Sequence, residues 1–488
     1  MKADLEELNE TLASLEKELS QSLNQQQQYL ELIPPGNQPA ARNLIQYLCF
    51  RSEDRKDLQE KLHLYGLSAL SNSENHIHRQ IQVIRERLGH RYHPEELNPC
   101  TYSYSQGKLT DNSQALFGSP DTQGMPTIMV TFDSSFAEDP ELVRNLLEQG
   151  MNVARINCAH DDEKVWKAMI GQIRRAEKIT GKRCKIHMDL AGPKIRTVLL
   201  GKGKDKGKVK VAVGETIWLS ETMEGFDDDT VVLHPNEKGI IASLESGHRI
   251  LIDDGEIEGR VSHTAAAKAA VNLERISSKK GRIKSEKGIN FPDTGLSIPS
   301  LTDFDRECLP FVCAHADIIG YSFVKNTADV RMLRKELEQI GNTIPALVYK
   351  IETPESVLNL PELILEGMRH PPFGIMIARG DLAVEIGFER MGEIQEEILW
   401  ICEAAHVPVV WATQVLENLH KSGMPTRSEI TDAGLASLAE CIMVNKGKHT
   451  ISVLKTLKEI MQRTSDRRNK KRFTLGALGM AKKFMRSS

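Results

Sequence analysis

Residues 346–381 combine side chains that bind charged ligands with the apolar runs of a sheet. Residues 347–351 alternate as a buried strand does, and Lys350 and Glu352 stand at the end of this run. A period of two places both side chains on one face of the strand. Lys350 offers a positive point charge, and Glu352 offers the hard oxygen ligands that Mg²⁺ prefers.

A second apolar run, residues 375–378, is followed closely by Gly380 and Asp381. Asp381 adds another carboxylate, and Gly380 lets a ligand approach the backbone closely. Mg²⁺ is commonly held by one or two carboxylates together with substrate oxygens. These residue types therefore predict a clamp for an anionic, phosphorylated substrate. The competing interpretation is a salt-bridged strand end without chemistry.

A helical segment separates the two clusters, so the stretch is predicted to be a strand–helix–strand unit with parallel strands. The carboxyl ends of parallel strands meet at one edge, where α/β proteins place their chemistry. The same alternation starts at Thr127 and extends to about residue 463. Eight strands, each with a helix, predict an α/β fold of the (β/α)₈ TIM-barrel type over residues 119–197 and 288–470.

Residues 198–287 interrupt this alternation with short strand-like runs separated by Gly, Asp and Lys. An insertion at this point follows a strand and lies beside the predicted site. We therefore expect a small all-β lid domain at 198–287.

Residues 1–118 are predicted to form an all-helical domain and a linker, and they carry no motif with a chemical mechanism. Residues 90–124 are rich in Pro, Ser, Gly and Asn, which is typical of a linker. The domain is a candidate for homo-oligomerisation, and because the barrel pattern is complete without it, we expect the barrel to fold after its removal. A basic tail is predicted at 471–488. The first helix is indicated by a three-four leucine spacing at Leu5, Leu8, Leu12, Leu15 and Leu19.

The composition excludes several classes of protein. The net charge of −4 argues against general nucleic-acid binding. No apolar run approaches the ~20 residues of a membrane span, and the acidic N-terminal segment lacks the apolar core of a secretory signal. Eight scattered cysteines without a CxxC pair predict reduced thiols in a cytoplasmic protein, with neither disulfides nor a zinc site.

Six segments resemble the active-site segments of pyruvate kinase, in the same order. They read GMNVARIN, GPKIRT, KIETPESV, ARGDLAVEIG, ATQVLENL and MPTRSEITD, and the resemblance extends over about residues 125–465. It implies a barrel with a β-rich lid, and a phosphotransferase that moves the phosphoryl group of phosphoenolpyruvate to ADP in glycolysis. The products would be pyruvate and ATP. The implied cofactor is Mg²⁺ or Mn²⁺, and the implied partners are these small-molecule substrates.

The resemblance also implies roles for single residues. Lys350 matches the lysine that stabilises the transferring phosphoryl group and the enolate, and Arg155 matches the arginine that holds the phosphate. Glu352 and Asp381 match the divalent-metal ligands. The other matches are the substrate-binding positions Gly380 and Thr413 and the nucleotide-side positions Asn157, His160, Arg196 and Arg249. A hydroxyl at the Thr413 position can orient a water or relay a proton to the enolate.

Three departures from the family concern a monovalent cation. Ala159 and Leu190 replace a serine and a threonine that help the family to bind K⁺, and Lys194 replaces a glutamate. Members with this lysine are known as K⁺-independent. We therefore expect the Lys194 ammonium to substitute for K⁺, which would not be required.

Three further departures affect other parts of the chain. The family's Gly-Pro-Ala-Ser segment has become Asp-Ser-Ser at 133–135, and its Ser-Gly-Glu-Thr loop has become Asn-Lys-Gly-Lys at 445–448. Both changes bear on catalytic efficiency. The C-terminal regulatory domain that the family usually carries is not expected here, because little sequence follows the last predicted helix.

Two alternatives to pyruvate kinase activity follow from the same residues. A metal-dependent lyase acting on pyruvate enolate would use similar Arg, Glu and Asp side chains on the same barrel. A non-catalytic scaffold or sensor would explain the altered loops. The presence of Lys350, Arg196 and the lid favours phosphoryl transfer, because a lyase does not need a nucleotide lid.

Overall fold

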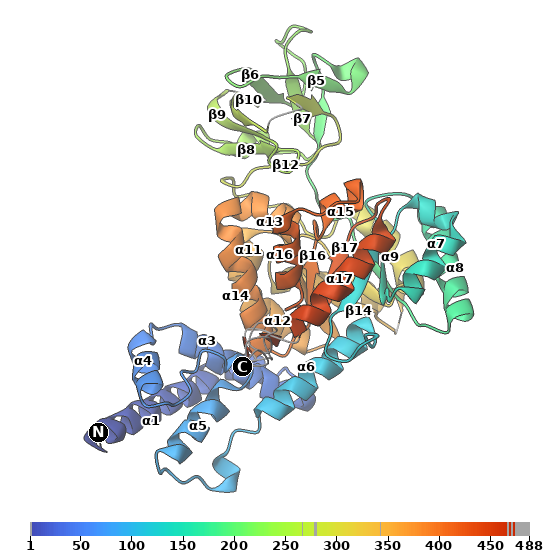
Figure 1. Ribbon diagram of the computed structural model, residues 1–488. Helices are drawn as coiled ribbons and strands as arrows, with labels where there is room; N and C mark the ends of the chain where they lie inside the picture. The colour runs from blue at the N-terminus through green and yellow to red at the C-terminus, as the bar shows by residue number, and fades with distance from the viewer. Residues whose placement is uncertain are drawn as a thin grey trace, which may run out of the picture.

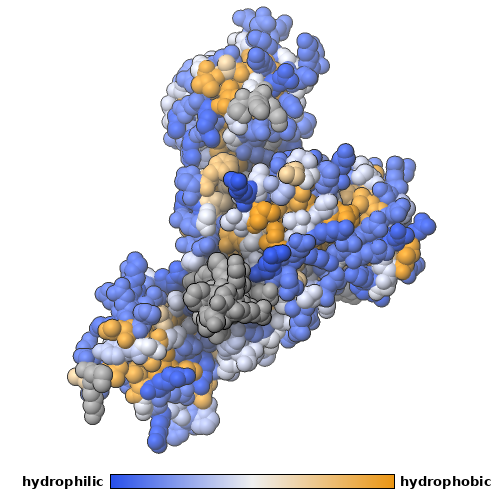
Figure 2. All heavy atoms as spheres, in the orientation of Figure 1, coloured by the Kyte–Doolittle hydropathy of each residue, from blue (hydrophilic) through white to orange (hydrophobic). Residues whose placement is uncertain are grey.

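Three lobes make up the computed structural model of the chain: a helical domain, a barrel and a β-rich lid (Figure 1). The same lobes are separate in the space-filling view, where a narrow neck joins the lid to the barrel (Figure 2). The structure describes residues 2–265, 267–277, 281–341 and 343–465, with two short strands, β18 (Arg468–Asn469) and β19 (Arg472–Phe473). The rest of the predicted basic tail at 471–488 lies outside the described residues.

The central lobe is a closed barrel of eight strands in the order β1-β17-β16-β15-β14-β13-β3-β2, and each neighbouring pair is parallel. This architecture, with its inserted lid and helical domain, confirms the predicted fold class. The strands are β1 (Thr127–Thr131), β2 (Val153–Asn157), β3 (Lys185–Asp189), β13 (Ile318–Tyr321), β14 (Ala346–Ile351), β15 (Phe373–Ala378), β16 (Val409–Ala412) and β17 (Cys441–Val444).

Helices surround the barrel, and several begin with a side-chain cap. Asp162 accepts from the backbone of Val165 at the start of α8 (Glu163–Thr180), and Thr302 and Asp305 form a capping box at the start of α9 (Asp303–His315). The helices of this ring are α7 (Pro140–Glu148), α8 (Glu163–Thr180), α9 (Asp303–His315), α10 (Thr327–Ile340), α11 (Pro354–Leu358), α12 (Leu360–Met368), α13 (Arg379–Ile386), α14 (Met391–Ala404), α15 (Glu417–Ser422), α16 (Arg427–Ala436) and α17 (Thr450–Ser465).

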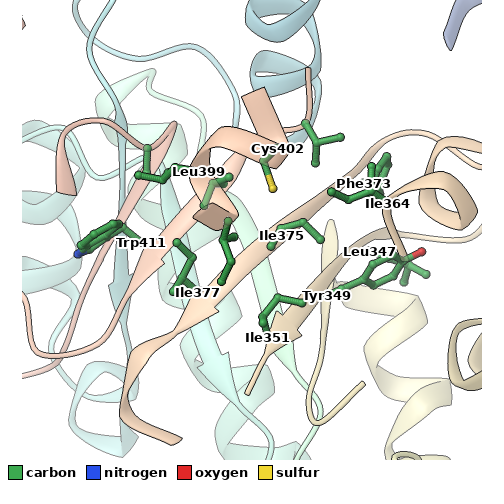
Figure 3. Packing of buried hydrophobic residues seen from close by; sticks show 14 of the residues in the cluster. Leu347, Tyr349, Ile351, Ile364, Phe373, Ile375, Ile377, Leu399, Cys402 and Trp411 are labelled. Carbon is green, nitrogen blue, oxygen red and sulfur yellow. The ribbon is translucent and has the colours of Figure 1, made fainter. Parts of the chain in front are cut away.

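Alternation along the strands separates the two faces of the barrel wall. Leu347, Tyr349 and Ile351 of β14 pack outward with residues of β15 and with the helices (Figure 3). The intervening Val348 belongs to a different cluster, inside the barrel. Lys350 therefore points inward from the same strand, which is the face that the period of two predicts.

The lid is a seven-stranded sheet with a two-stranded ribbon, built around its own apolar core. The chain enters and leaves it at the neck, where Arg196 pairs with Gly288. Its strands are β4 (Thr197–Leu199), β5 (Lys208–Lys210), β6 (Thr216–Ser220), β7 (Val232–Pro235), β8 (Arg249–Ile252), β9 (Ile257–Ala265), β10 (Lys268–Ile276), β11 (Arg282–Lys284) and β12 (Ile289–Asn290).

The N-terminal lobe consists of helices that pack through apolar faces. Four of the five leucines of the predicted seam, all except Leu5, are buried. The lobe also contacts the barrel, because Asn43 Nδ2 donates to the backbone oxygen of Ala404 at the end of α14. Its helices are α1 (Lys2–Gln25), α2 (Gln27–Leu30), α3 (Gln38–Arg51), α4 (Lys56–Leu64), α5 (Ile77–Arg87) and α6 (Tyr102–Phe117).

Helix α6 corrects the predicted linker at 90–124. It runs beneath the barrel (Figure 1), with Thr101 as its N-cap. Leu116 and Phe117 at its end are fully buried and belong to the cluster inside the barrel, together with Met129 and Val348. The segment is helical because its apolar end closes the floor of the barrel.

No helix in the described part of the chain combines the length and the apolar character needed to cross a bilayer.

Candidate active site

A cavity of about 260 Å³ opens at the carboxyl ends of the barrel strands, beside the lid. Its lining includes Asp253 and Asp254 from the lid as well as residues of several barrel strands. Ten of the eleven predicted site residues line it: Arg155, Asn157, His160, Lys194, Arg196, Lys350, Glu352, Gly380, Asp381 and Thr413.

Lys350 and Glu352 form a buried ion pair at the end of β14. The Lys350 Nζ lies 3.1 Å from Glu352 Oε1 and donates to Ser322 Oγ over 2.7 Å. The other oxygen of Glu352 accepts from the backbone N–H of Phe323 over 2.6 Å. Burial, together with the charge of Asp381, raises the pKa of Glu352, although Lys350 opposes this shift. The pair is held rigidly because each member has a second hydrogen-bond partner.

Asp189, at the end of β3, is fully buried between positive groups. Its Oδ2 accepts from Arg155 Nε over 2.6 Å and lies 3.8 Å from Lys350 Nζ. Its Oδ1 lies 2.7 Å from Nε2 of His187. Burial opposes ionisation, but the charges of Arg155 and Lys350 outweigh it and hold the pKa of Asp189 well below its ordinary value.

The same carboxylates keep Lys350 charged. Burial alone would favour the neutral amine, yet Asp189 and Glu352 raise the pKa of Lys350 above its ordinary value. Arg155 is fixed further by Thr131, whose Oγ1 accepts from Arg155 Nη1 over 3.2 Å. Two cations therefore face the cavity in fixed positions, compensated by buried carboxylates.

Lys194 connects the barrel to the lid. Its Nζ donates to Asp381 Oδ1 over 2.7 Å and lies 3.7 Å from Asp254 Oδ1 of the lid. Burial opposes the charge, but Asp381 and then Asp254 raise the pKa of Lys194. The ammonium group thus faces a predicted metal ligand inside the cavity.

Thr413 has an unusual backbone and an unpaired hydroxyl. Its φ of 65° lies in the left-handed region, which a β-branched residue rarely adopts. Its buried Oγ1 has no hydrogen-bond partner among the described residues. A Cβ built on Gly380 would lie 3.7 Å from this Oγ1. The hydroxyl therefore faces the space that Gly380 leaves open, where a ligand can complete its hydrogen bonding.

Arg379 holds the loop that carries Thr413. Its Nε donates to the backbone oxygen of Ala412 over 3.0 Å, and its Nη2 donates to the oxygen of Thr413. Both terminal nitrogens also contact Asp432, and the guanidinium lies over the ring of Trp411. These contacts secure the strained loop to the ends of β15 and β16.

Of the four residues predicted on the nucleotide side, Asn157, His160 and Arg196 line the cavity and Arg249 does not. Asn157 caps its own loop by accepting from the backbone of Ala159, and Arg196 Nη1 donates to the backbone oxygen of Glu286 in the lid. Burial, then the charges of Lys446 and Arg196, lower the pKa of His160. Arg249 does not line the cavity, and its guanidinium forms a two-nitrogen ion pair with Asp293.

The two loops that depart from the family pattern contact each other through opposite charges. Lys446 Nζ lies 3.4 Å from Asp133 Oδ2, so the loop after β17 pairs with the segment after β1. Asp133 Oδ1 also accepts from the backbone of Ser135 over 3.0 Å. The substitutions at 133–135 and 445–448 thus create an ion pair between the segments that follow the neighbouring strands β1 and β17.

The donor set fits a hard divalent cation that shares its coordination with a substrate. In the described part of the chain, no cluster of three or more His, Cys, Asp and Glu residues is arranged to hold a metal ion. Glu352 and Asp381 supply two carboxylates in one cavity, and each is charge-compensated by a lysine. Two carboxylates suit Mg²⁺ when substrate oxygens and waters complete the shell.

Sequence reasoning missed four groups that organise this site: Asp189, His187, Arg379 and Ser322. A signal existed for the first two, because an aspartate and a histidine two residues apart on one strand share a face. Arg379 and Ser322 act through contacts with distant elements, which local sequence patterns do not reveal.

The fold and the cavity define a barrel protein with a charged cavity at the carboxyl ends of its strands. The family described as pyruvate kinase, barrel domain, matches residues 126–450. This match covers more than half of the chain, and the chain therefore belongs to the pyruvate kinase family. The predicted resemblance is confirmed.

Curated relatives named pyruvate kinase are moderately similar to this chain. The pyruvate kinase of Staphylococcus saprophyticus is 32% identical over 332 residues, which cover 66% of this chain and 54% of the relative. That of Sporosarcina psychrophila is 34% identical over 302 residues, covering 62% and 49%. That of Thermotoga maritima is 32% identical over 327 residues, covering 66% and 67%. The chain thus spans about half the length of the first two relatives.

Proposed function

We propose that this protein catalyses the pyruvate kinase reaction, the transfer of the phosphoryl group of phosphoenolpyruvate to ADP. The observation that carries the proposal is the convergence of Arg155 and Lys350 on one cavity that also contains Glu352 and Asp381. Phosphoryl transfer requires positioning and charge neutralisation more than covalent chemistry by the protein. A cavity with fixed cations and a pair of carboxylates meets this requirement.

Arg155 and Lys350 bind the phosphoryl group in this proposal. Both are held by Asp189, so neither has to reorganise when the substrate arrives. Preorganised charge is effective where negative charge develops in the transition state. Lys350 also stabilises the enolate oxygen as the phosphoryl group leaves.

The substrate carboxylate binds at the start of α13. No side chain caps this helix, and Gly380 leaves its first turn open toward Thr413. Backbone N–H groups at a helix N-terminus attract anions. The unpaired hydroxyl of Thr413 lies at the edge of the same space, where it orients a water or passes a proton to the enolate.

Glu352 and Asp381 would hold Mg²⁺ or Mn²⁺ in this arrangement. Such an ion neutralises the charge of the phosphoryl oxygens when it is bound. Lys194 contributes a fixed positive charge next to Asp381, and Ala159 and Leu190 offer no side-chain oxygen to a monovalent cation. The proposed activity is therefore independent of K⁺.

The nucleotide binds on the side of Asn157, His160 and Arg196, beneath the lid. Arg196 lies at the neck of the lid and lines the cavity, which supports a phosphate contact. Arg249 reaches ADP only if its ion pair with Asp293 opens or the lid moves.

The test is an assay of the purified chain with phosphoenolpyruvate, ADP and Mg²⁺ in a buffer free of K⁺. Pyruvate is measured by coupled reduction and ATP by luminescence, and equal amounts of both are expected. Omitting ADP should abolish pyruvate formation. Pyruvate without ATP would indicate that the phosphoryl group passes to water, which is hydrolysis of phosphoenolpyruvate, and a folded protein that forms neither product would contradict the proposal.

A further inference from the structure

His187 is a buried ionisable residue that the proposed reaction does not use. It lies on β3, two residues before Asp189, and its side chain is fully buried. The strands beside it contribute Val153 and Ile318 to the cluster inside the barrel. A leucine would pack at this position without the cost of burying an imidazole.

The hydrogen-bonding state of the ring follows from its partner. Asp189 is ionised and can only accept, so Nε2 of His187 carries the proton and donates to Oδ1 over 2.7 Å. The other ring nitrogen, Nδ1, has no partner among the described residues. Packing alone gains nothing from such an arrangement, because one ring nitrogen is left unsatisfied.

Gly320 of β13 makes space for this pair. It lies directly opposite Asp189 in the register of the two strands. A Cβ at Gly320 would fall 1.8 Å from Asp189 Oδ1 and 2.6 Å from His187 Nε2. The absence of a side chain at Gly320 is therefore required for the His187–Asp189 hydrogen bond.

The two oxygens of Asp189 have separate partners. Oδ1 is held by His187, and Oδ2 faces Arg155 at 2.6 Å and Lys350 at 3.8 Å. Without the donor at Oδ1, the carboxylate can rotate and leave one oxygen buried and unsatisfied. Any such rotation moves Arg155 and the charge that compensates Lys350.

We infer that His187 is a positioning residue, which orients Asp189 so that Arg155 and Lys350 are aligned for the phosphoryl group. This inference rests on the proposed function. It predicts that His187 acts on substrate affinity and turnover although it contacts neither substrate nor metal.

The experiment compares His187→Leu, which removes the donor at similar volume, with His187→Gln, which keeps an amide N–H within reach of Asp189. Phosphoenolpyruvate binding is measured by calorimetry without ADP, and KM and kcat are measured separately. His187→Leu should weaken binding by at least about tenfold and lower kcat, because small misplacements of catalytic groups are costly. His187→Gln should stay within about threefold of the unmodified protein.

Two further variants separate positioning from simple stability. His406→Asn changes another buried histidine, at the opposite end of the barrel, and should leave phosphoenolpyruvate affinity unchanged. In an Asp189→Asn background, His187→Leu should have little additional effect, because the two residues act as one unit. If His187→Leu does not fold, His187→Ala, which also lacks the donor, replaces it.

The outcomes are distinct. Unchanged affinity and turnover in a folded His187→Leu protein, beside normal binding by the unmodified protein, would overturn this inference alone. Loss of thermal stability without kinetic change would do the same. Failure of the unmodified protein to bind phosphoenolpyruvate would overturn the proposed function and the inference together.

Discussion

The two ends of the barrel solve the problem of burying polar groups in opposite ways. At the mouth, Lys350, Glu352 and Asp189 are buried as ions, and each compensates another. At the floor, Leu116 and Phe117 of α6 close the barrel with apolar side chains. A charge can be kept inside a protein only beside its partner, so the mouth is a connected network and the floor a simple plug.

Two polar side chains near the floor, His406 and Asn112, are neutral. His406 is fully buried, its Nε2 contacts the backbone oxygen of Asn75 over 2.9 Å, and burial lowers its pKa to about 4. Asn112 Nδ2 donates to the backbone oxygen of His406 over 2.7 Å. The comparison suggests that chemistry depends on the mouth, whereas the floor and the helical domain determine stability.

The largest expected effect on metal use concerns the carboxylates of the mouth. Glu352→Gln and Asp381→Asn each remove an anionic ligand, so each should raise the Mg²⁺ concentration for half-maximal activity by at least about 100-fold. The measurement is a Mg²⁺ titration of pyruvate formation, with Glu60→Gln, an exposed carboxylate on α4 of the helical domain, as the control. Full activity of the unmodified protein after exhaustive chelation would show that no metal is used.

Disrupting the apolar packing at the floor of the barrel should lower stability and leave metal use unchanged. Phe117→Ala leaves a cavity inside the barrel and should lower the free energy of unfolding by about 3–5 kcal/mol. Thermal denaturation measures the loss, and the exposed Ile179→Ala should change stability by less than about 0.5 kcal/mol. Equal melting temperatures for Phe117→Ala and the unmodified protein would mean that α6 does not seal the barrel.

His406 should make the junction of the two lobes sensitive to acid. The folded state favours the neutral ring, so its contribution is complete above pH 6.5, the ordinary pKa, and is lost as the pH falls toward 4. A shift of this size corresponds to about 3 kcal/mol. His406→Asn suits the left-handed φ of 52° and should flatten the fall in melting temperature from pH 7 to 4. If the melting temperatures of the two proteins fall in parallel between pH 7 and 4, His406 is not the source of the acid sensitivity.

The smallest effect should come from monovalent cations. Replacing K⁺ by a large organic cation at equal ionic strength should change the rate by less than about twofold, because a second cation near Lys194 is repelled. Lys194→Met should weaken phosphoenolpyruvate binding, whereas Lys202→Met on the lid surface should not. Strong activation of the unmodified protein by K⁺ would disprove the proposal that the Lys194 ammonium takes the place of K⁺.

The sequence predicts the mouth better than the floor for a physical reason. Lys350 and Glu352 reveal their common face through a local period of two. Asp189 shares a face with His187 by the same period, but the partners that give it a role, Arg155 of β2 and Lys350 of β14, lie far away in the sequence.

Helix α6 was predicted as part of a linker because most of its residues are polar. Its buried apolar side chains are Leu109, Leu116 and Phe117, and the last two fill a space that the barrel supplies. For the same reason, the structure does not favour the expectation that the barrel folds without residues 1–118. A shorter deletion, which keeps α6, preserves the plug.

The nucleotide-side assignment of Arg249 stays a prediction. Its position before the lid strand β8 resembles a nucleotide-binding position of the family. The structure pairs it with Asp293, 44 residues away, because the local surroundings in the lid decide the side chain's partner.

The most direct test measures turnover of Lys350→Met and Phe117→Ala together, at a temperature where both are folded. Lys350→Met should lose at least about 10³-fold, because preorganised charge at a developing anion is worth several kcal/mol. Phe117→Ala should remain within about threefold of the unmodified protein, since it contacts no ligand group. Turnover of Lys350→Met within tenfold of the unmodified protein, or an equal loss in Phe117→Ala, would contradict the assignment of the chemistry to the mouth of the barrel.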